Sequence, residues 1–173
     1  WWFGKAADAG NAAAQNEVSA RIDTLLQAAA IWEEKVDDKE RAAELYERVR
    51  ALDAGNRIAS ERLEEIYRSQ YRWEQLNEVL LERVEYTELQ ADRIRLLQTV
   101  ARIYEEELGD QESAFVVLQA AFRYDYSDED TGRELERLAT AAGKWEDLLA
   151  DYTQVVQALE RDDRDRASGL WVK

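Results

Sequence analysis

Apolar residues recur along most of this chain at the three- and four-residue spacing of amphipathic helices. The clearest stretch is 101–121, where one helical pattern stops at Gly109-Asp110 and a second returns through Ala114 and Leu118. Glycine can adopt the left-handed backbone that ends a helix, and an aspartate carboxylate can cap the next one. This pattern predicts two antiparallel helices joined by a tight turn.

The same reasoning predicts helices over most of the chain. Pro is absent and only 7 Gly are present, so little is available for a strand-and-turn fold. We therefore expect an all-α chain of four antiparallel helical hairpins. The predicted helical ranges are 21–36, 39–52, 57–70, 73–89, 92–108, 111–124, 131–142 and 145–160.

These hairpins repeat in sequence. Residues 21–90 and 93–162 align without a gap at an offset of 72, with 18 identities in 70 positions. A 34-residue repeat of two antiparallel helices is typical of a helical solenoid, in which stacked hairpins share one core. The helix that follows each turn also begins in the same way, because a glutamate recurs at intervals of 34, 38 and 34 residues. These residues are Glu40, Glu74, Glu112 and Glu146.

The pattern within the hairpins indicates a family. Two first helices place a large residue, an alanine and an aromatic residue along one face, and one second helix places small, large and small residues. These residues are Leu25, Ala29 and Trp32, then Leu97, Ala101 and Tyr104, and in the second helix Ala114, Leu118 and Ala121. On these marks the range 21–160 resembles a tetratricopeptide repeat (TPR) array. The resemblance implies an α-solenoid, a TPR-like superhelix, whose first helices line a concave surface that binds other proteins.

The first 18 residues differ from the rest because they are rich in alanine and nearly free of charge. Trp2, Phe3, Gly10 and Asn11 resemble a junction of the Sel-like repeat family, which implies that one helix ends at Gly10 and another starts after Asn11. The alternative is a single Ala-rich capping helix. The expected organisation is a partial repeat or cap at 1–20, the array at 21–160 and the start of a further repeat helix at 161–173.

The charge balance narrows the class of partner. With 38 acidic and 23 basic residues, the net charge is −15. This charge opposes the phosphate backbone of nucleic acids and an anionic membrane surface, and no apolar run approaches the ~18–20 residues that cross a bilayer. We therefore expect no nucleic-acid binding and no membrane insertion, and we expect a protein partner, with basic proteins favoured in the encounter.

The residue types argue against catalysis. His and Cys are absent, which removes the usual acid–base group at neutral pH, the commonest metal ligand and thiolate chemistry. No Gly-rich phosphate loop occurs. We expect no enzyme activity, no cofactor and no metal site. Met is also absent, so we expect a fragment, a processed or engineered chain, or an incompletely read sequence. The 18 Arg against 5 Lys hint at a GC-rich bacterial source, and a soluble, cytoplasmic location is the default.

Three features could carry chemistry, and each has a structural alternative. Runs of glutamate could be paired catalytic carboxylates or a solvated helix face. The acidic connector 125–130 could attract calcium, or Ser127 or Asp128 could cap the next helix. The tryptophans of the array could form an aromatic ligand box or could pack between helices. The structural interpretation is favoured in each case.

The candidate binding residues follow from the geometry of the TPR family. They are polar residues on the exposed side of the first helices: Glu33, Glu61, Glu65, Arg68, Arg95, Gln98, Arg102, Glu105, Arg133 and Arg137. A second set could form end interfaces: Trp1, Trp2, Phe3, Leu170 and Trp171. The predicted function is a non-catalytic scaffold or adaptor that binds another protein. The alternative is a structural subunit that stacks through its uncapped ends into a homo-oligomer or a larger complex.

Overall fold

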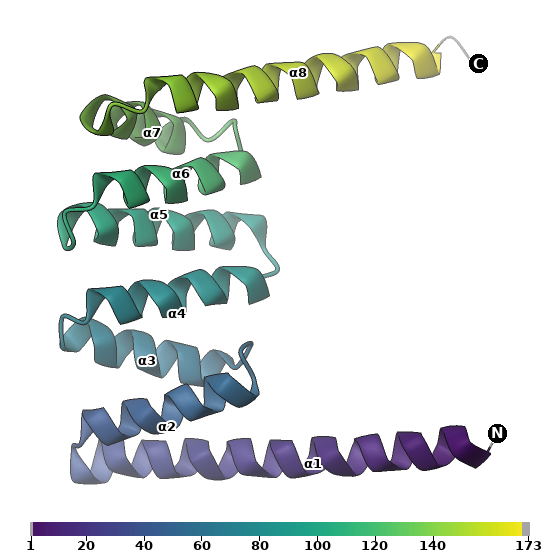
Figure 1. Ribbon diagram of the computed structural model, residues 1–173, viewed down its shortest axis with the longest axis vertical. Helices are drawn as coiled ribbons and strands as arrows, with labels where there is room; N and C mark the ends of the chain where they lie inside the picture. The colour runs from purple at the N-terminus through teal and green to yellow at the C-terminus, as the bar shows by residue number, and fades with distance from the viewer. Residues whose placement is uncertain (1, 171–173) are drawn as a thin grey trace. The chain divides into compact units, whose positions relative to one another are not determined.

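The computed structural model describes the backbone of residues 2–170 and the side chains of residues 14–157 (Figure 1). Within that backbone every regular element is a helix, and the segments between helices are turns and short connections. The chain divides into two compact units, Trp1–Tyr86 and Thr87–Lys173. In each unit consecutive helices run antiparallel and pack side by side, which confirms the predicted helical hairpins.

The first unit packs its helices in chain order, with α1 against α2, α2 against α3 and α3 against α4. Its small residues Ala29 and Ala42 are completely buried, so packed helices can approach closely at these positions. Larger side chains such as Tyr46 and Leu63 fill the remaining core. The helices are α1 (Trp2–Ile31) with a wider π-helical turn η1 (Trp32–Val36) at its end, α2 (Lys39–Leu52), α3 (Arg57–Ser69) and α4 (Trp73–Tyr86).

The second unit repeats this arrangement, because α5 packs against α6, α6 against α7 and α7 against α8. Ala101, Ala114 and Ala121 are the buried small residues, and Phe115 and Leu135 are among the large ones. Each unit is therefore a short stretch of helical solenoid. The helices are α5 (Gln90–Glu106), α6 (Gln111–Tyr124), α7 (Glu129–Ala142) and α8 (Trp145–Leu170).

The turns inside the four hairpins share one backbone conformation. Asp37, Tyr71, Gly109 and Gly143 have φ angles of 60°, 58°, 67° and 69°, and each follows the first helix of its hairpin. Their spacing of 34, 38 and 34 residues is the spacing of the glutamates in the sequence. The sequence repeat is therefore also a repeat of backbone geometry.

The hydrogen bonds at these turns repeat at the same offset of 72. The residue after each left-handed position donates its N–H to a carbonyl of the preceding helix, which satisfies one of the carbonyls that a helix end leaves open. The four bonds are Asp38 to Trp32 at 2.9 Å, Arg72 to Tyr67 at 2.9 Å, Asp110 to Tyr104 at 2.8 Å and Lys144 to Ala139 at 2.8 Å.

Carboxylates cap the helices that follow the turns and connectors. Asp38 caps α2 and Asp110 caps α6, each accepting a bond of 3.0 Å from the N–H three residues further on. Asp128 caps α7 by accepting from the N–H of Asp130 at 3.3 Å. The capping interpretation of the acidic connector is therefore confirmed for Asp128, and the two caps at Asp38 and Asp110 explain why α2 and α6 begin where the sequence predicts.

Both ends of the array differ from the prediction. Because α1 runs from Trp2 to Ile31 without interruption, the predicted helix end at Gly10 is wrong, and the single Ala-rich helix is correct. A glycine inside a helix costs only about 1 kcal/mol relative to alanine, and the surrounding alanines favour the helix. Likewise α8 continues past its predicted end at residue 160 to Leu170. The division into 1–20, 21–160 and 161–173 stays a prediction.

Candidate functional site

The structure brings together the predicted binding residues of the second unit. Five of them line one pocket of about 520 Å³: Arg95, Gln98, Arg102, Glu105 and Arg137. The first four lie on α5 and the last lies on α7. Arg133 of α7 does not line this pocket and instead pairs with Asp130 of its own helix.

The pocket forms a groove between α5 and α7. Both helices pack on α6, so the floor is apolar and is formed by Ala101, Leu118 and Leu138, one from each helix. These three floor residues are at least 95 % buried as components of the core. The walls carry the polar and charged side chains, which is the usual composition of a site that recognises a ligand by shape and a few polar contacts.

A hydrogen-bonded bridge crosses the groove between α5 and the start of α7. Gln98 of α5 donates from Nε2 to Oγ1 of Thr131 at 2.8 Å and to Oδ2 of Asp128 at 3.2 Å. Thr131 is buried, and its hydroxyl donates to the same Asp128 oxygen at 2.6 Å. Because Asp128 also caps α7, this bridge fixes the start of α7 against α5.

An ion pair forms a second bridge across the groove. Arg137 of α7 donates from Nη1 and Nη2 to the two carboxylate oxygens of Glu105 at 2.7 and 2.5 Å, and from Nε to Glu134 at 2.9 Å. The hydrogen bonds from Arg137 hold the pKa of Glu105 below its usual range, and the hydrogen bonds to Glu105 and Glu134 raise the pKa of Arg137. A bidentate arginine–carboxylate pair fixes geometry as well as charge.

Between the two bridges lies Arg102, which has no carboxylate partner among the side chains that the structure describes. Arg102 follows Gln98 by four residues and precedes Glu105 by three, so all three side chains lie on one face of α5. Arg102 is exposed. Among the residues whose side chains are described, none places a carboxylate within 4.0 Å of it. In the described part of the chain, the rim therefore offers a cation without a carboxylate partner, Arg102, over an apolar floor.

The predicted residues of the first unit are arranged differently. Glu33 accepts from the hydroxyl of Tyr46 at 3.0 Å and lies 4.0 Å from Arg62 of α3. Glu61 and Arg68 lie on α3 and pair within that helix, with Arg57 at 3.8 Å and with Glu64 at 3.0 Å. These contacts tie the predicted residues to neighbouring helices or to their own helix.

Glu33 and Glu105 are equivalent in the 72-residue repeat, yet they pair with arginines one helical turn apart. Glu33 lies near Arg62, and Arg62 pairs with Glu65 at 3.1 Å. At the equivalent positions of the second unit the signs are exchanged, because Glu134 stands in place of Arg62 and Arg137 in place of Glu65. The glutamate of the first helix is thus present in both units. Its arginine lies at position 62 of α3 in the first unit and one helical turn later in the repeat, at position 137 of α7, in the second.

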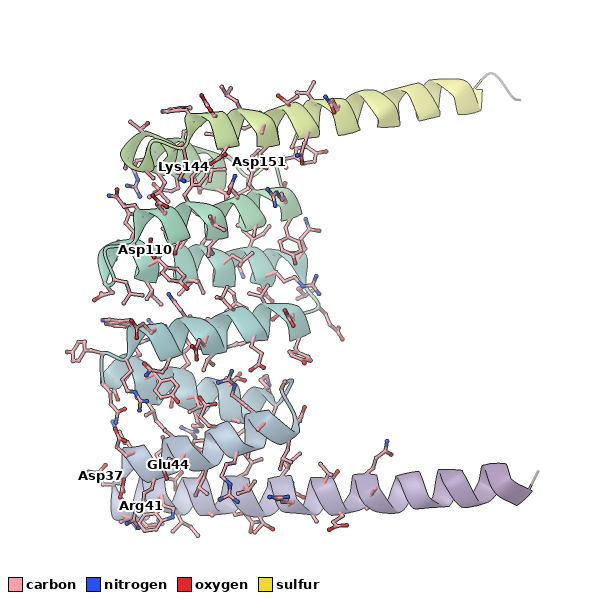
Figure 2. All side chains as sticks on the ribbon, viewed as in Figure 1. Asp37, Arg41, Glu44, Asp110, Lys144 and Asp151 are labelled. Atoms are coloured by element: carbon pink, nitrogen blue, oxygen red, sulfur yellow. The ribbon has the colours of Figure 1, made fainter. Side chains whose placement is uncertain are left out.

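A buried carboxylate in the second unit was missed from the sequence. Asp151 of α8 is 4 % exposed and accepts from Nε2 of Gln119 at 2.6 Å and from Nη2 of Arg123 at 2.8 Å (Figure 2). Both partners lie on α6, so this contact joins α6 to α8. The sequence feature that could have revealed Asp151 is its position on the apolar face of the helix, three residues after the buried Leu148.

The remaining predictions have separate outcomes. The proposed end interfaces at Trp1, Trp2, Phe3, Leu170 and Trp171 lie outside the described side chains. Within the described part of the chain, no group of three acidic side chains is arranged to hold a metal ion, and no helix is long and apolar enough to cross a membrane.

Each of the array's tryptophans has a different environment. Trp32 lies under the guanidinium of Arg41 at 4.5 Å, Trp73 packs edge-to-face on Tyr71, and Trp145 is exposed.

No family model and no curated protein matches the chain. Solved structures that resemble it include a double mutant of MamA RS-1, at 18 % identity over 82 % of this chain and 76 % of that one, with a TM-score of 0.44. Another is the second TPR domain of human RPAP3 in complex with an HSP70 peptide, at 14 % identity over 70 % of this chain and 97 % of that one, with a TM-score of 0.44. A TPR domain is therefore among the solved structures that resemble this chain. The Sel-like resemblance of residues 1–20 has no support.

Proposed function

We propose that this chain is a non-catalytic protein-binding module that holds a segment of a partner protein in the groove between α5 and α7. The observation that supports this proposal most directly is Arg102, which has no carboxylate partner among the described side chains and lies between two bridges, above an apolar floor. The two bridges hold the walls in one arrangement before any partner binds, and such preorganisation lowers the entropic cost of binding.

The groove is poorly suited to acid–base catalysis. A general acid or base works best with a pKa near the operating pH. The pKa of Glu105 is shifted the other way, below its usual range, because Arg137 stabilises its charged form. Glu105 and Arg137 therefore neutralise each other, and in this proposal they position the walls of the groove.

The lining also indicates the chemistry of the bound segment. An apolar side chain would occupy the floor of Ala101, Leu118 and Leu138, and an acidic group would neutralise Arg102. The partner as a whole can still be basic, because the net charge of −15 acts over the longer distances that govern the encounter. The two requirements concern different parts of the partner.

A comparison of two charge-reversal variants tests this proposal. Arg102→Glu changes the groove, whereas Arg48→Glu changes an exposed arginine of α2 that has no carboxylate within 4.0 Å among the described side chains. Both variants change the net charge by the same amount, so any difference between them is local. Proteins captured from an extract of the source cells by the unmodified chain are compared with those captured by each variant.

We expect Arg48→Glu to retain the partner and Arg102→Glu to lose it. Substitution of a residue central to an interface typically costs more than about 1 kcal/mol, which is a factor of about five in affinity. Equal capture by the two variants would contradict the groove as the binding site. A partner lost equally with both variants would indicate that only the overall charge matters.

The alternative function, stacking of copies through the ends of the chain, was predicted at Trp1, Trp2, Phe3, Leu170 and Trp171. These residues contribute no support, because their side chains lie outside the described part of the structure.

A further inference from the structure

A second pocket of the second unit is lined by α6, the end of α5 and the start of α8, and it shares no lining residue with the groove. This α6–α8 pocket has a volume of about 350 Å³, and its lining includes Tyr104, Val116, Val117, Glu112 and Asp147. The tyrosine is half-buried, and both carboxylates are exposed. An aromatic ring beside carboxylates is a favourable environment for a cation.

The equivalent place in the first unit is filled by an arginine of the chain itself. Trp32 is the equivalent of Tyr104 at the offset of 72, and the guanidinium of Arg41 lies over its ring, 4.5 Å from the centroid. Nε of Arg41 also lies 3.5 Å from a carboxylate oxygen of Asp38. The guanidinium is therefore held between an aromatic face and a carboxylate, and its planar shape suits both contacts.

In the second unit Ser113 stands at the position of Arg41. Its backbone N–H donates to Asp110 at 3.0 Å, as the N–H of Arg41 donates to Asp38 at 3.0 Å, so the backbone is equivalent at the two positions. The short serine side chain only reaches Asp110, to which its hydroxyl donates at 2.6 Å. Among the side chains that the structure describes, no cation lies over the ring of Tyr104. The ring therefore lines a pocket at the place where the first unit holds a guanidinium.

The lysine that lines the pocket leaves room for a second cation. Nζ of Lys144 lies 3.8 Å from a carboxylate oxygen of Glu112. The equivalent pair in the first unit is Arg72 with Glu40, at 3.7 Å, and it exists there together with the bound guanidinium of Arg41. An ion pair at this position is thus compatible with a guanidinium on the neighbouring ring.

The charges around the pocket favour a basic occupant. The hydroxyl and the backbone N–H of Ser113 hold the pKa of Asp110 below its usual range, so this carboxylate is charged at neutral pH. Glu112 and Asp147 add two exposed carboxylates, and the net charge of −15 attracts basic proteins over longer distances. The valine at position 116, which is 60 % exposed, offers an apolar surface for the aliphatic stem of a long basic side chain.

We propose that the α6–α8 pocket binds an arginine side chain of a basic protein, other than the partner in the groove. The guanidinium lies over Tyr104 and beside Asp110, in the arrangement that Arg41 has in the first unit, and the aliphatic stem packs on Val116. Arginine suits the site better than lysine, because a planar guanidinium stacks on an aromatic face. The pocket and the groove have no lining residue in common, so each can be occupied without the other.

An NMR titration of the whole chain with N-acetyl-arginine amide tests this proposal. The citrulline analogue is the matched control probe, because it has nearly the same shape and no charge. The lysine analogue carries the same charge without the planar group. The backbone amide signals of Ser113, Val116 and Val117 report whether the pocket is occupied.

Two variants exchange the situation of the two units. Ser113→Arg gives the second unit its own guanidinium over Tyr104, and Arg41→Ser removes the one of the first unit. The backbone at position 113 should accept arginine, since Arg41 makes the same capping bond. Thr153→Arg is the charge-matched control, because Thr153 is exposed on α8 and does not line the pocket. Circular dichroism checks the helical content of each variant.

The unmodified chain and Thr153→Arg should bind the arginine probe at the pocket, and the citrulline probe should bind about fivefold more weakly. Ser113→Arg should weaken the arginine probe by a similar factor, because its own side chain occupies the place. Arg41→Ser should retain the response of the pocket and add a response of the amide signals around Trp32.

Four results would overturn the proposal. Absence of any response at the pocket of the unmodified chain would mean that it holds no guanidinium. Equal binding of the arginine and citrulline probes would show that charge is not recognised. Tighter binding of the lysine probe would assign the pocket to an ammonium group. Equal effects of Ser113→Arg and Thr153→Arg would mean that only the overall charge of the chain matters.

Discussion

Tyr71 and Gly143 lie 72 residues apart and adopt the same left-handed backbone, with φ angles of 58° and 69°. An L-residue other than glycine typically loses about 1–2 kcal/mol in this conformation. The hairpin turn therefore imposes its geometry even where the sequence supplies a bulky aromatic residue. Asp37 and Gly109 show the same relationship. At these turns the backbone conformation repeats at an offset of 72 residues even where the side chains differ.

This relationship predicts opposite effects for two glycine substitutions. Gly143→Ala should lower the free energy of unfolding by about 1 kcal/mol through the left-handed backbone alone, because nothing lies within 4 Å of the added Cβ. Gly132→Ala should raise it by about 0.5–1 kcal/mol, since Gly132 lies in α7 with open space and no left-handed φ. Urea denaturation measures both. Changes of the same sign would contradict this account of the turns.

The caps of the returning helices give a second prediction. Asp110→Ala should destabilise the fold by about 1 kcal/mol, because the first turn of α6 loses the acceptor for its N–H. The hydroxyl and N–H of Ser113 hold the pKa of Asp110 below its usual range. The cap therefore stabilises the fold above the ordinary pKa of an aspartate, near 3.9, and is lost as pH falls through the lower folded value. A loss of stability that is the same at pH 7 and pH 2 would disagree with this cause.

The buried Asp151 gives a third prediction. Asp151→Ala should lower the free energy of unfolding by about 1–3 kcal/mol, because Gln119 loses its acceptor in a half-buried site. Asp151→Asn should cost less, since the amide oxygen can still accept from Gln119. Asp23→Ala is the control, because Asp23 is exposed on α1 and its loss should stay within about 0.5 kcal/mol. Equal costs for Asp151→Ala and Asp23→Ala would show that the contact between α6 and α8 contributes nothing.

The ion pair across the groove gives a fourth prediction. A double-mutant cycle of Glu105→Gln and Arg137→Gln should show a coupling of about 0.2–1 kcal/mol at pH 7, a modest value because both side chains are partly exposed. The folded pKa of Glu105 is below its ordinary value near 4.3. The coupling should therefore persist above pH 4.3 and disappear as pH falls through the lower folded pKa. Coupling that remains undiminished at pH 2 would indicate packing rather than charge.

The helices were predictable wherever a local chemical signal marked their ends. The range 39–52 of α2 and the range 111–124 of α6 agree with the prediction because Asp38 and Asp110 are caps that the sequence shows directly. The break predicted at Gly10 did not occur, because a single glycine cannot outweigh the alanines around it. The π-helical turn Trp32–Val36 had no signal in the periodicity, because it ends the helix and no later apolar positions of that helix could show the extra residue.

The sequence predicts which residues belong to the candidate site, but it does not predict which of their side chains form ion pairs. Helical spacing places Gln98, Arg102 and Glu105 on one face of α5, and this much follows from the sequence. Whether an arginine is free or paired depends on which residue of the next hairpin lies opposite. Arg137 pairs with Glu105, whereas Arg102 has no carboxylate within 4.0 Å among the described side chains. That outcome is set by how α5 and α7 pack on α6, which the spacing of residues along one helix does not determine.

The central claim, that the groove between α5 and α7 receives a partner protein, is tested most directly by site-specific cross-linking. The chain has no Cys, so a single introduced cysteine carries a photoreactive label at one known place. Glu106→Cys puts the label on the groove wall, and Val116→Cys puts it on the exposed side of α6. With the captured partner present, the account predicts a cross-linked product from position 106 and little from position 116. A product from position 116, with none from position 106, would contradict it.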